Sequence, residues 1–421
     1  MLHINHIRKD LHNCIKLFKK RNIDVADSLN EVVKKDDIRK KIQQDLEKLL
    51  QKSNELSRKV GEFYKAGDLD AANTLKLETK SIKEQSKDLQ QKQINLADEI
   101  KNLLEGIPNI PHLSVPSGKD EKHNKLIREV GEKPELNSNA KPHWDLAVEY
   151  NLIDFDLGTK ITGAGFPVYV ERGARLQRAL ISYFLDKNIS AGYIEYLPPH
   201  LVNYNSAYGT GQLPKFEDDL YKIASEGLYL IPTAEVPITN LFRDVIIKEF
   251  PVKCTSYTPC FRQEAGSYGK DVRGLNRLHQ FDKVEIVQIE KNNNSYQALD
   301  EMVQHIARIL DDLKLPYRIV QLCGGDLGFS SALTYDFEVY SAAQKRWLEV
   351  SSVSNFESFQ ANRLKLRYKD EDGKMQLCHT LNGSALALPR IFAALIENNQ
   401  TSKGIVIPGV LQSYTGFDII S

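Results

Sequence analysis

The residues with the clearest chemical meaning lie in one stretch of the chain, from Cys260 to Glu285. It holds an arginine, Arg262, two residues before an acid, Glu264, and it ends at a second acid, Glu285. A guanidinium forms paired hydrogen bonds with phosphate or carboxylate oxygens and keeps its charge. These side chains in one unit suit the activation of a carboxylate by ATP.

The spacing in this stretch predicts a β-hairpin. Side chains two residues apart on a strand project from the same face. Two such sets occur here: Arg262 with Glu264, and Phe281 with Lys283 and Glu285. Gly266, Gly269 and Gly274 between them allow turns that close over a ligand. An Arg-x-Glu triplet alone is more typical of surface ion pairs, which are common and weak, so the interpretation depends on the whole stretch.

In its Gly-Lys-Asp-x-x-Gly-Leu-x-Arg-x-His-Gln-Phe form, the stretch resembles motif 2 of the class II aminoacyl-tRNA synthetases, and that of the seryl-tRNA synthetases in particular. Further segments match the family in its own order: GTGQLPKF (209–216), PTAEVP (232–237), LEVSSVSN (348–355) and HTLNGSALALPR (379–390). The resemblance covers nearly all 421 residues. It implies activation of L-serine by ATP and transfer to the 3′-end of tRNA(Ser), and it leaves open whether tRNA(Sec) is also charged.

The resemblance implies how ATP is held. Activation needs positioning and charge neutralisation at the α-phosphorus, with no enzyme nucleophile. Arg262 would bind the α-phosphate and the serine carboxylate, and Arg390 would pair with the γ-phosphate, which makes these two the catalytic candidates. Glu264 would accept from the adenine amino group and Phe281 would stack on the ring, a contact worth roughly 1 to 3 kcal/mol. The implied ATP set is Arg262, Gln263, Glu264, Phe281, Glu349, Val350, Ser351, Ser352 and Arg390.

Glu349 and Ser352 resemble the family's Mg²⁺ ligands. This ion prefers hard oxygen donors, with one or two from the protein and others from substrate phosphates. A lone glutamate in a strand is more often a half-exposed surface acid. The order of the motifs favours the metal-binding role.

Serine has a very small side chain, so its selection must rest on hydrogen bonds to the hydroxyl and not on pocket volume. Acids in the pocket can hold the ammonium group and accept from the hydroxyl. The implied serine set is Thr233, Ala234, Glu235, Arg262, Glu285, Asn382 and Ser384. The segment 209–216 would border the site as a mobile loop.

The elements that must position these residues indicate an α+β fold with an antiparallel sheet. Short strand-like runs such as LTYDFEVY and RWLEVSSVS alternate with amphipathic helices such as YQALDEMVQHIARILDDL. No Walker motif occurs, and GAGFPVY does not complete a dinucleotide fingerprint. We expect an N-terminal helical domain at 1–105, a linker at 106–142 rich in proline and polar residues, and a class II catalytic domain at 143–421.

Residues 28–104 predict an antiparallel coiled-coil arm. Apolar residues recur every seven positions in two series: Ile42, Leu49, Leu56 and Phe63, then Leu75, Ile82, Leu89, Leu96 and Leu103. Gly67, in KAGDLDA, allows the chain to reverse between them. About 35 residues per helix gives an arm roughly 50 Å long. Polar Ser53, Thr79, Ser86 and Gln93 between the leucines predict a thin seam.

Heptads by themselves indicate packing, as in a generic oligomerisation coil. The resemblance implies instead that the arm binds the long variable arm of tRNA. The net charge is zero, with 56 basic and 56 acidic residues, so RNA contacts must come from local groups of cations. Candidates are Lys34, Lys35, Arg39, Lys40, Lys41, Arg58, Lys59, Lys76, Lys80 and Lys83, none of them assigned individually.

Five scattered cysteines lack zinc-site spacing and suit free thiols in a reducing cytoplasm. No signal peptide or membrane-spanning run is found, so we expect a soluble cytoplasmic protein. The resemblance implies a homodimer formed through the motif 1 region, 165–186. The chain departs from the family pattern at four positions: Val353, Phe356, Ser358 and Asn362. Val353 and Phe356 suit apolar packing beside the site, and we expect none of the four to touch the predicted ATP and serine sets.

Two other functions stay open on the sequence. One is a catalytically silent paralogue that only binds tRNA, which the intact set of charged site residues opposes. The other is a ligase that loads amino acids onto a carrier protein, and such relatives are expected to lack the long arm.

Overall fold

The computed structural model describes residues 1–136, 139–265 and 273–421, and they form two compact units. The helical unit comprises residues 2–16 and 24–107. The sheet unit comprises Met1, residues 17–23 and residues 108–421. Each unit is described by itself below.

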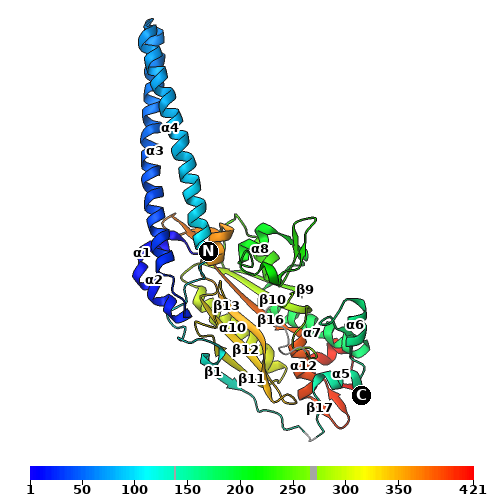
Figure 1. The fold of residues 1–421 in the computed structure, drawn as a ribbon. Coiled ribbons are helices and arrows are strands. Elements are labelled where there is room, and N and C mark those ends of the chain that lie inside the picture. The colour runs from blue at the N-terminus through cyan, green and yellow to red at the C-terminus, as the bar shows by residue number, and fades with distance from the viewer. Residues whose placement is uncertain (137–138, 266–272) are drawn as a thin grey trace. The chain divides into compact units, whose positions relative to one another are not determined.

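Two long helices dominate the helical unit, α3 (Ala26–Ala66) and α4 (Leu69–Glu105), and they pack against each other along their length (Figure 1). Gly67 ends α3 in the left-handed conformation, with φ 78°, which glycine adopts without steric cost. Asp68 then caps α4 by accepting from the Ala71 N–H. The predicted antiparallel hairpin with its reversal at Gly67 is confirmed.

The seam between α3 and α4 contains polar residues as well as apolar ones. The buried residues of the two helices are Leu29, Val32, Asp36, Leu46, Ser53, Leu56, Ala72, Thr79, Ile82, Ser86, Ile100 and Leu104. The Thr79 hydroxyl is satisfied by donating to Leu75 O within its own helix. Phe63, close to the turn, is exposed. The prediction of a thin seam with polar positions is therefore confirmed.

Ion pairs fasten the base of this hairpin. Asp36 is buried and binds three cations: Arg8 Nη1 of α1 (Ile4–Lys9) at 3.1 Å, Arg39 Nη2 at 2.8 Å and Lys40 Nζ at 3.3 Å. Lys35 Nζ of α3 lies 2.6 Å from a carboxylate oxygen of Glu99 on α4. These contacts hold α1, α3 and α4 together near the ends of the arm farthest from its turn. The remaining helix of this region, α2, spans Leu11–Phe18.

The sheet unit is built on one eight-stranded sheet (Figure 1). In spatial order its strands are β1 (Lys125–Val130), β11 (Tyr317–Gln321), β12 (Leu333–Ser341), β13 (Arg346–Asn355), β16 (His379–Ala387), β10 (Gln280–Glu290), β9 (Val252–Phe261) and β4 (Ile194–Glu195). Neighbours run antiparallel except β4, which runs parallel to β9. The predicted α+β fold with an antiparallel sheet is confirmed.

Three helices pack on this sheet and share its main hydrophobic core: α7 (Glu171–Ser190), α10 (Ser295–Asp312) and α12 (Leu388–Asn398). Val284 and Ile286 of β10 belong to that core. Since side chains alternate along a strand, Lys283 and Glu285 project from the opposite face. That face carries the polar side chains of the candidate site.

The other elements are short. The helices are α5 (His143–Glu149), α6 (Phe155–Ile161), α8 (Tyr204–Thr210), α9 (Glu235–Asn240), α11 (Phe359–Leu364) and α13 (Gly409–Thr415). Small sheets pair β2 (Ile153–Asp154) with β3 (Val168–Tyr169), β7 (Leu228–Leu230) with β5 (Leu201–Asn203) and β6 (Lys222–Ile223), β14 (Arg367–Lys369) with β8 (Ile246–Ile247) and β15 (Met375–Leu377), and β18 (Gly404–Val406) with β17 (Gln400–Thr401) and β19 (Ile419–Ile420). In residues 1–136, 139–265 and 273–421, no helix is long and apolar enough to cross a membrane.

The segment 106–142, expected to lack regular structure, contains an edge strand of the main sheet. β1 pairs antiparallel with β11. Leu126 and Ile127 of β1 are both exposed, so the strand shows no alternation of apolar and polar residues. Backbone pairing along the sheet edge forms it, and the pattern of side chains does not reveal such pairing.

The predicted hairpin of β9 and β10 is present, but one detail of the alternation was wrong. β9 ends at Phe261, so Arg262 and Glu264 lie beyond the strand. The Arg262 N–H still donates to His279 O at 2.9 Å, whereas Glu264 adopts a left-handed φ of 54° that ends the extended conformation. Gly274 is in the left-handed conformation expected of a turn, with φ 67°. Gly266, Gly269 and the Gly-Lys-Asp of the motif lie outside the described residues.

Candidate active site

A cavity of about 600 Å³ opens on the polar face of the sheet unit, and most of the predicted site residues line it. Those that do are Thr233, Glu235, Arg262, Glu264, Phe281, Glu285, Glu349, Val350, Ser351, Ser352, Asn382, Ser384 and Arg390. They come from segments up to about 150 positions apart in the chain, which the strand order β13, β16, β10 and β9 brings side by side. Arg262, Arg390 and Glu349 thus border one space, as a shared nucleotide would require.

Two residues of the predicted sets, Ala234 and Gln263, are not among the described residues that line the cavity. Ala234 is completely buried. The Gln263 side chain donates from Nε2 to Leu220 O at 2.7 Å, and its N–H donates to Asp219 O at 2.9 Å. Gln263 therefore fastens the chain next to the site instead of facing the cavity.

An acidic pair with one cation lies at the part of the cavity lined by β10 and α9. Glu285 is 1% exposed, and its Oε2 lies 2.7 Å from Lys283 Nζ. Glu285 pairs in the β10–β16 register with Ser384, another lining residue. Lys283, itself buried and cavity-lining, belongs to neither predicted set. Its place in the Phe281, Lys283, Glu285 alternation was the signal that pointed to it.

Glu235 begins α9, and a chain of buried amides and hydroxyls holds it. Gln360 Nε2 donates to Glu235 Oε1 at 2.6 Å and to Thr210 O at 3.0 Å, while Thr380 Oγ1 donates to Gln360 Oε1 at 2.7 Å. Burial, together with the nearby charge of Glu285, raises the pKa of Glu235 from 4.5 to about 7. Burial also raises the pKa of Glu285. The Glu235 carboxyl can therefore exchange its proton near neutral pH when a cation enters.

The raised pKa of Glu235 predicts how stability depends on pH. Between about pH 4.5 and pH 7 the unfolded chain has released this proton while the folded protein keeps it. The free energy of unfolding should therefore be highest below this window and fall as pH rises through it, by about 3 kcal/mol. Urea unfolding of the wild type and of Glu235→Gln at both ends of the window checks this, since the variant should lack that part of the decline. Equal pH dependence in the two proteins would contradict it.

Arg262 lies between a carbonyl and an aromatic ring. Its Nε donates to Pro232 O at 3.3 Å, and its Cζ lies 5.2 Å from the centre of the Phe281 ring. A cation over an aromatic face is attracted by the ring's electron distribution. The guanidinium is thus held at the cavity wall with other N–H donors left for a ligand.

Glu264 forms an ion pair with Arg277 Nη1, and both side chains line the cavity. Arg277 and its neighbour Asn276 were missed by the sequence interpretation because no alternation of charged residues marks them. The carboxylate of Glu264 has a second oxygen, so the ion pair leaves it able to accept another hydrogen bond.

Arg390 lies in the first turn of α12, and two backbone carbonyls orient it. Its Nη1 donates to Glu349 O at 2.7 Å, and its Nε donates to Asn276 O at 3.2 Å. The Glu349 carboxylate in turn accepts from Ser352 Oγ at 3.3 Å. Glu349 and Ser352 so offer two neighbouring hard oxygen donors at the cavity, a donor set that fits Mg²⁺ completed by phosphates and water.

In the three described ranges there is no cluster of three or more His, Cys, Asp or Glu side chains that could hold a metal ion by itself. A Mg²⁺ ion bound here would therefore take part of its coordination from a ligand.

The segment 209–216 borders the cavity through Gln212 and Phe216. Arg363 Nη1 fastens this segment by donating to Tyr208 O at 3.1 Å and Leu213 O at 2.7 Å.

Of the four departures from the family pattern, Phe356 lines the cavity, which agrees with the expectation that it packs beside the site. Asn362 donates from Nδ2 to Met1 O at 3.0 Å.

Comparison with known proteins finds two family models that match separate parts of the chain. Residues 1–111 match the family model of the seryl-tRNA synthetase N-terminal domain, and residues 215–399 match that of the class II tRNA synthetase core domain (G, H, P, S and T). The serine–tRNA ligase of Salinibacter ruber is 46% identical over 99% of this chain and 98% of its own length. That of Nautilia profundicola is 48% identical over 98% of this chain and 100% of its own length.

Solved structures of seryl-tRNA synthetases also match this chain over its whole length. The crystal structure of seryl-tRNA synthetase from Pyrococcus horikoshii complexed with ATP matches with a TM-score of 0.93 and 32% identity, covering 100% of this chain and 99% of that one. The cytoplasmic serine–tRNA ligase of Naegleria fowleri in complex with AMP matches with a TM-score of 0.89 and 26% identity, with the same coverage.

Proposed function

The chain belongs to the seryl-tRNA synthetase family, and from this premise we propose that it activates L-serine with ATP and transfers the seryl group to the 3′-end of tRNA(Ser). The observation that carries the proposal is the single cavity shared by Arg262, Arg390, Glu235 and Glu285. It joins two phosphate-binding cations to two buried acids.

ATP would bind between the two arginines. Arg262 would bind the α-phosphate and the serine carboxylate, and Arg390, oriented by two carbonyls, would bind the γ-phosphate. Charge that develops on the transferring phosphoryl group is neutralised by cations already in place, so little reorganisation is needed during the reaction. Glu264 would accept from the adenine amino group, and Phe281 would stack on the base.

Glu349 and Ser352 would hold Mg²⁺ beside the phosphates of ATP. The bound ion would supply further neutralisation of phosphate charge. In this chain the two residues are already hydrogen-bonded to each other, and the Glu349 carbonyl is tied to Arg390. The residues proposed to hold the metal and the arginine proposed to bind the γ-phosphate are thus connected through β13, the strand that carries Glu349 and Ser352.

Serine would bind at the acidic pair. Glu235 would take the ammonium group, which favours the ionised carboxylate, and Glu285 would accept from the hydroxyl. Thr233, Asn382 and Ser384 line the same part of the cavity. Lys283, paired with Glu285, favours the ionised form of that acid against the effect of burial, and the ionised form would accept from the hydroxyl.

The direct test is serine-dependent exchange of pyrophosphate into ATP by the purified full-length chain, with alanine as the matched substrate control. A site that hydrogen-bonds a hydroxyl rejects the analogue without it by a factor on the order of 10⁴. We expect exchange with serine and essentially none with alanine. Absence of serine-dependent exchange would contradict the proposal and favour the silent tRNA-binding paralogue.

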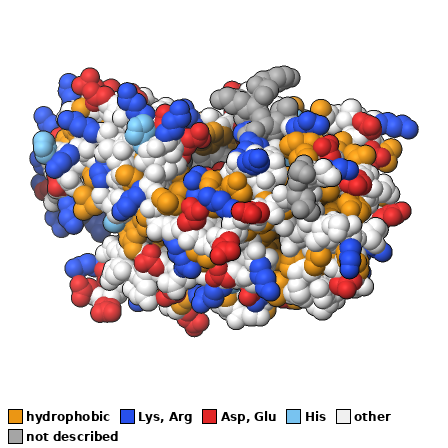
Figure 2. All heavy atoms as spheres, turned by 90° about the horizontal axis from the view of Figure 1, so that it is seen from below, with side chains coloured by type: hydrophobic (Ala, Val, Ile, Leu, Met, Phe, Trp, Pro, Cys, Tyr) orange, Lys and Arg blue, Asp and Glu red, His pale blue; other side chains and the backbone are white. Residues whose placement is uncertain are grey.

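We further propose that the arm binds the tRNA. On the face drawn in Figure 2, acidic and basic side chains are interspersed, in keeping with the net charge of zero. On the arm, five of the candidate cations have no ion pair with any described residue: Lys34, Lys41, Lys76, Lys80 and Lys83. Three of them, Lys76, Lys80 and Lys83, are exposed at positions that share one face of α4. We therefore assign the phosphate contacts to this face.

The working state is proposed to be a homodimer formed through residues 165–186, in a reducing cytoplasm that suits five buried free cysteines. Size-exclusion chromatography with light scattering should give twice the chain mass of 47.8 kDa. A stable monomer with full exchange activity would contradict the dimer.

A further inference from the structure

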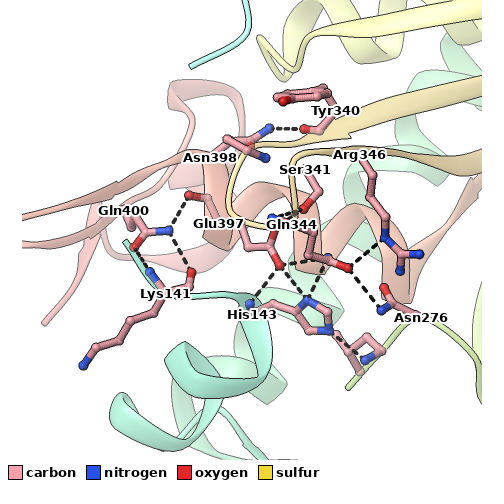
Figure 3. A network of polar contacts seen from close by, with 12 residues as sticks. Lys141, His143, Asn276, Tyr340, Ser341, Gln344, Arg346, Glu397, Asn398 and Gln400 are labelled. Atoms are coloured by element: carbon pink, nitrogen blue, oxygen red, sulfur yellow. Dashed lines mark hydrogen bonds and ion pairs between the residues drawn. The ribbon is translucent and has the colours of Figure 1, made fainter. Parts of the chain in front are cut away.

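A buried polar network centred on His143 joins segments that adjoin the candidate site (Figure 3). His143 begins α5, and its partner Glu397 lies near the end of α12, the helix that carries Arg390 in its first turn. Both side chains are 0% exposed. Neither belongs to the site residues described above.

The Glu397 carboxylate is fully occupied by donors. Its Oε1 accepts from His143 N at 2.8 Å, from His143 Nδ1 at 2.7 Å and from Gln344 Nε2 at 3.0 Å. Its Oε2 accepts from Ser341 Oγ. A buried carboxylate with four donors has its desolvation offset without a ligand, so it serves to orient the groups around it.

The hydrogen bonds determine the state of the His143 ring. Leu275 N–H donates to His143 Nε2 at 2.8 Å, so Nε2 carries no proton, and Nδ1 is the ring nitrogen that donates to Glu397. The neighbouring Gly274 has φ 67°, and a Cβ atom there would lie 2.2 Å from Nε2. The ring therefore packs directly on the backbone of residues 274–275 and accepts from it.

The same network also holds the side chain of Asn276, the residue after Leu275, through Gln344. Gln344 Oε1 accepts from Asn276 Nδ2 at 3.2 Å and from Arg346 Nε at 3.1 Å, while Gln344 Nε2 is anchored on Glu397. The carbonyl of Asn276 is one of the two acceptors that orient Arg390. Leu275 and Asn276 both line the cavity.

We propose that His143 is a positioning residue for ATP. Its Nε2 fixes the Leu275 N–H, Glu397 and Gln344 fix the Asn276 side chain, and the Asn276 carbonyl so placed sets the Arg390 guanidinium at the phosphates. This inference rests on the proposed function, in which Arg390 binds the γ-phosphate.

Replacing His143 by glutamine or by asparagine tests the roles of the two ring nitrogens one at a time. His143→Gln places an amide oxygen where Nε2 lies and keeps an acceptor for Leu275 N–H. His143→Asn places its amide at the position of Nδ1, so it can bond Glu397 but leaves Leu275 N–H without an acceptor. Both variants remove the ring, and Asn is shorter than Gln by one methylene, so urea unfolding of both variants is measured to separate lost packing from the effect on ATP.

In serine-dependent pyrophosphate exchange we expect His143→Asn to raise the KM for ATP about tenfold and His143→Gln to remain within about threefold of wild type. The KM for serine should stay unchanged in both. Equal effects of the two variants, or a loss of stability without a selective rise in the KM for ATP, would reduce His143 to a structural role and overturn the proposal. Wild-type activity is measured in parallel, so failure of the proposed function itself is seen separately.

Gln344→Leu is the second variant, used if neither His143 variant folds. Gln344 is only half-buried and lies in the β12–β13 turn, so the fold should tolerate its replacement. It removes the acceptor of the Asn276 side chain, Gln344 Oε1, and should also raise the KM for ATP selectively. An unchanged KM for ATP in this variant would overturn the proposal.

Discussion

Replacing Glu285 with alanine is expected to abolish serine-dependent pyrophosphate exchange while ATP still binds. The change removes the acceptor for the serine hydroxyl and leaves Lys283 Nζ, 2.7 Å away, without its buried partner. An uncompensated buried charge costs about 3 to 5 kcal/mol, and the positive charge would now face the ammonium group of the substrate. Exchange should fall by at least about 10³-fold, measured beside ATP binding by thermal shift.

Glu290→Ala is the matched control for this prediction. Glu290 lies on the same strand and is also buried, but it accepts from Gln288 Nε2 at 3.0 Å and is not among the described residues that line the cavity. Both variants lose a buried acid of β10, and only Glu285→Ala should lose exchange. Unchanged exchange in Glu285→Ala, or equal loss in both, would remove Glu285 from serine recognition.

Shortening the arm should abolish tRNA charging and leave serine activation intact. The ion pairs Lys35–Glu99 and Lys52–Glu78 give the register of α3 against α4. Replacing residues 44–89 by a short glycine-containing turn therefore removes the outer arm and keeps the base, where Asp36 binds three cations. We expect charging of tRNA(Ser) to fall on the order of 100-fold or more, because the phosphate contacts of the arm are lost.

Pyrophosphate exchange by the shortened protein should equal that of the wild type, because the cavity belongs entirely to the sheet unit. Retained charging of tRNA(Ser) would contradict the role of the arm. Absence of tRNA charging by the unshortened chain, with serine activation intact, would instead favour a ligase whose acceptor is a carrier protein.

The three exposed lysines on one face of α4 allow the role of the arm in tRNA binding to be tested without removing the arm. Substituting Lys76, Lys80 and Lys83 with alanine should weaken tRNA binding and reduce the slope of log affinity against log salt by about 2 to 3. Arg58 and Lys59, already paired with Glu62 and Glu55, provide control substitutions on the same arm. Equal weakening of tRNA binding by the α4 lysine substitutions and by the control substitutions would show a general effect of charge and not a defined contact face.

The features that could be predicted from the amino-acid sequence are those whose signal is local. Seven-residue spacing specifies which faces of two helices meet, and Gly67 with Asp68 specifies where they reverse. Motif order then indicated the family and the main charged residues, such as Arg262, Glu285 and Arg390. Periodicity and turn residues predicted the arm because each pattern reports the faces or the end of one element, whereas the site residues came from the resemblance of the motifs to the family.

Which side chains from distant segments meet became known only from the folded chain. The register of β10 with β9 and the path of the chain after β9 place Arg277 against Glu264 and turn Gln263 away from the cavity. Packing of α12 against α5 joins His143 to Glu397, 254 positions along the chain. Such contacts depend on how elements pack against one another, and no spacing within a single element records that.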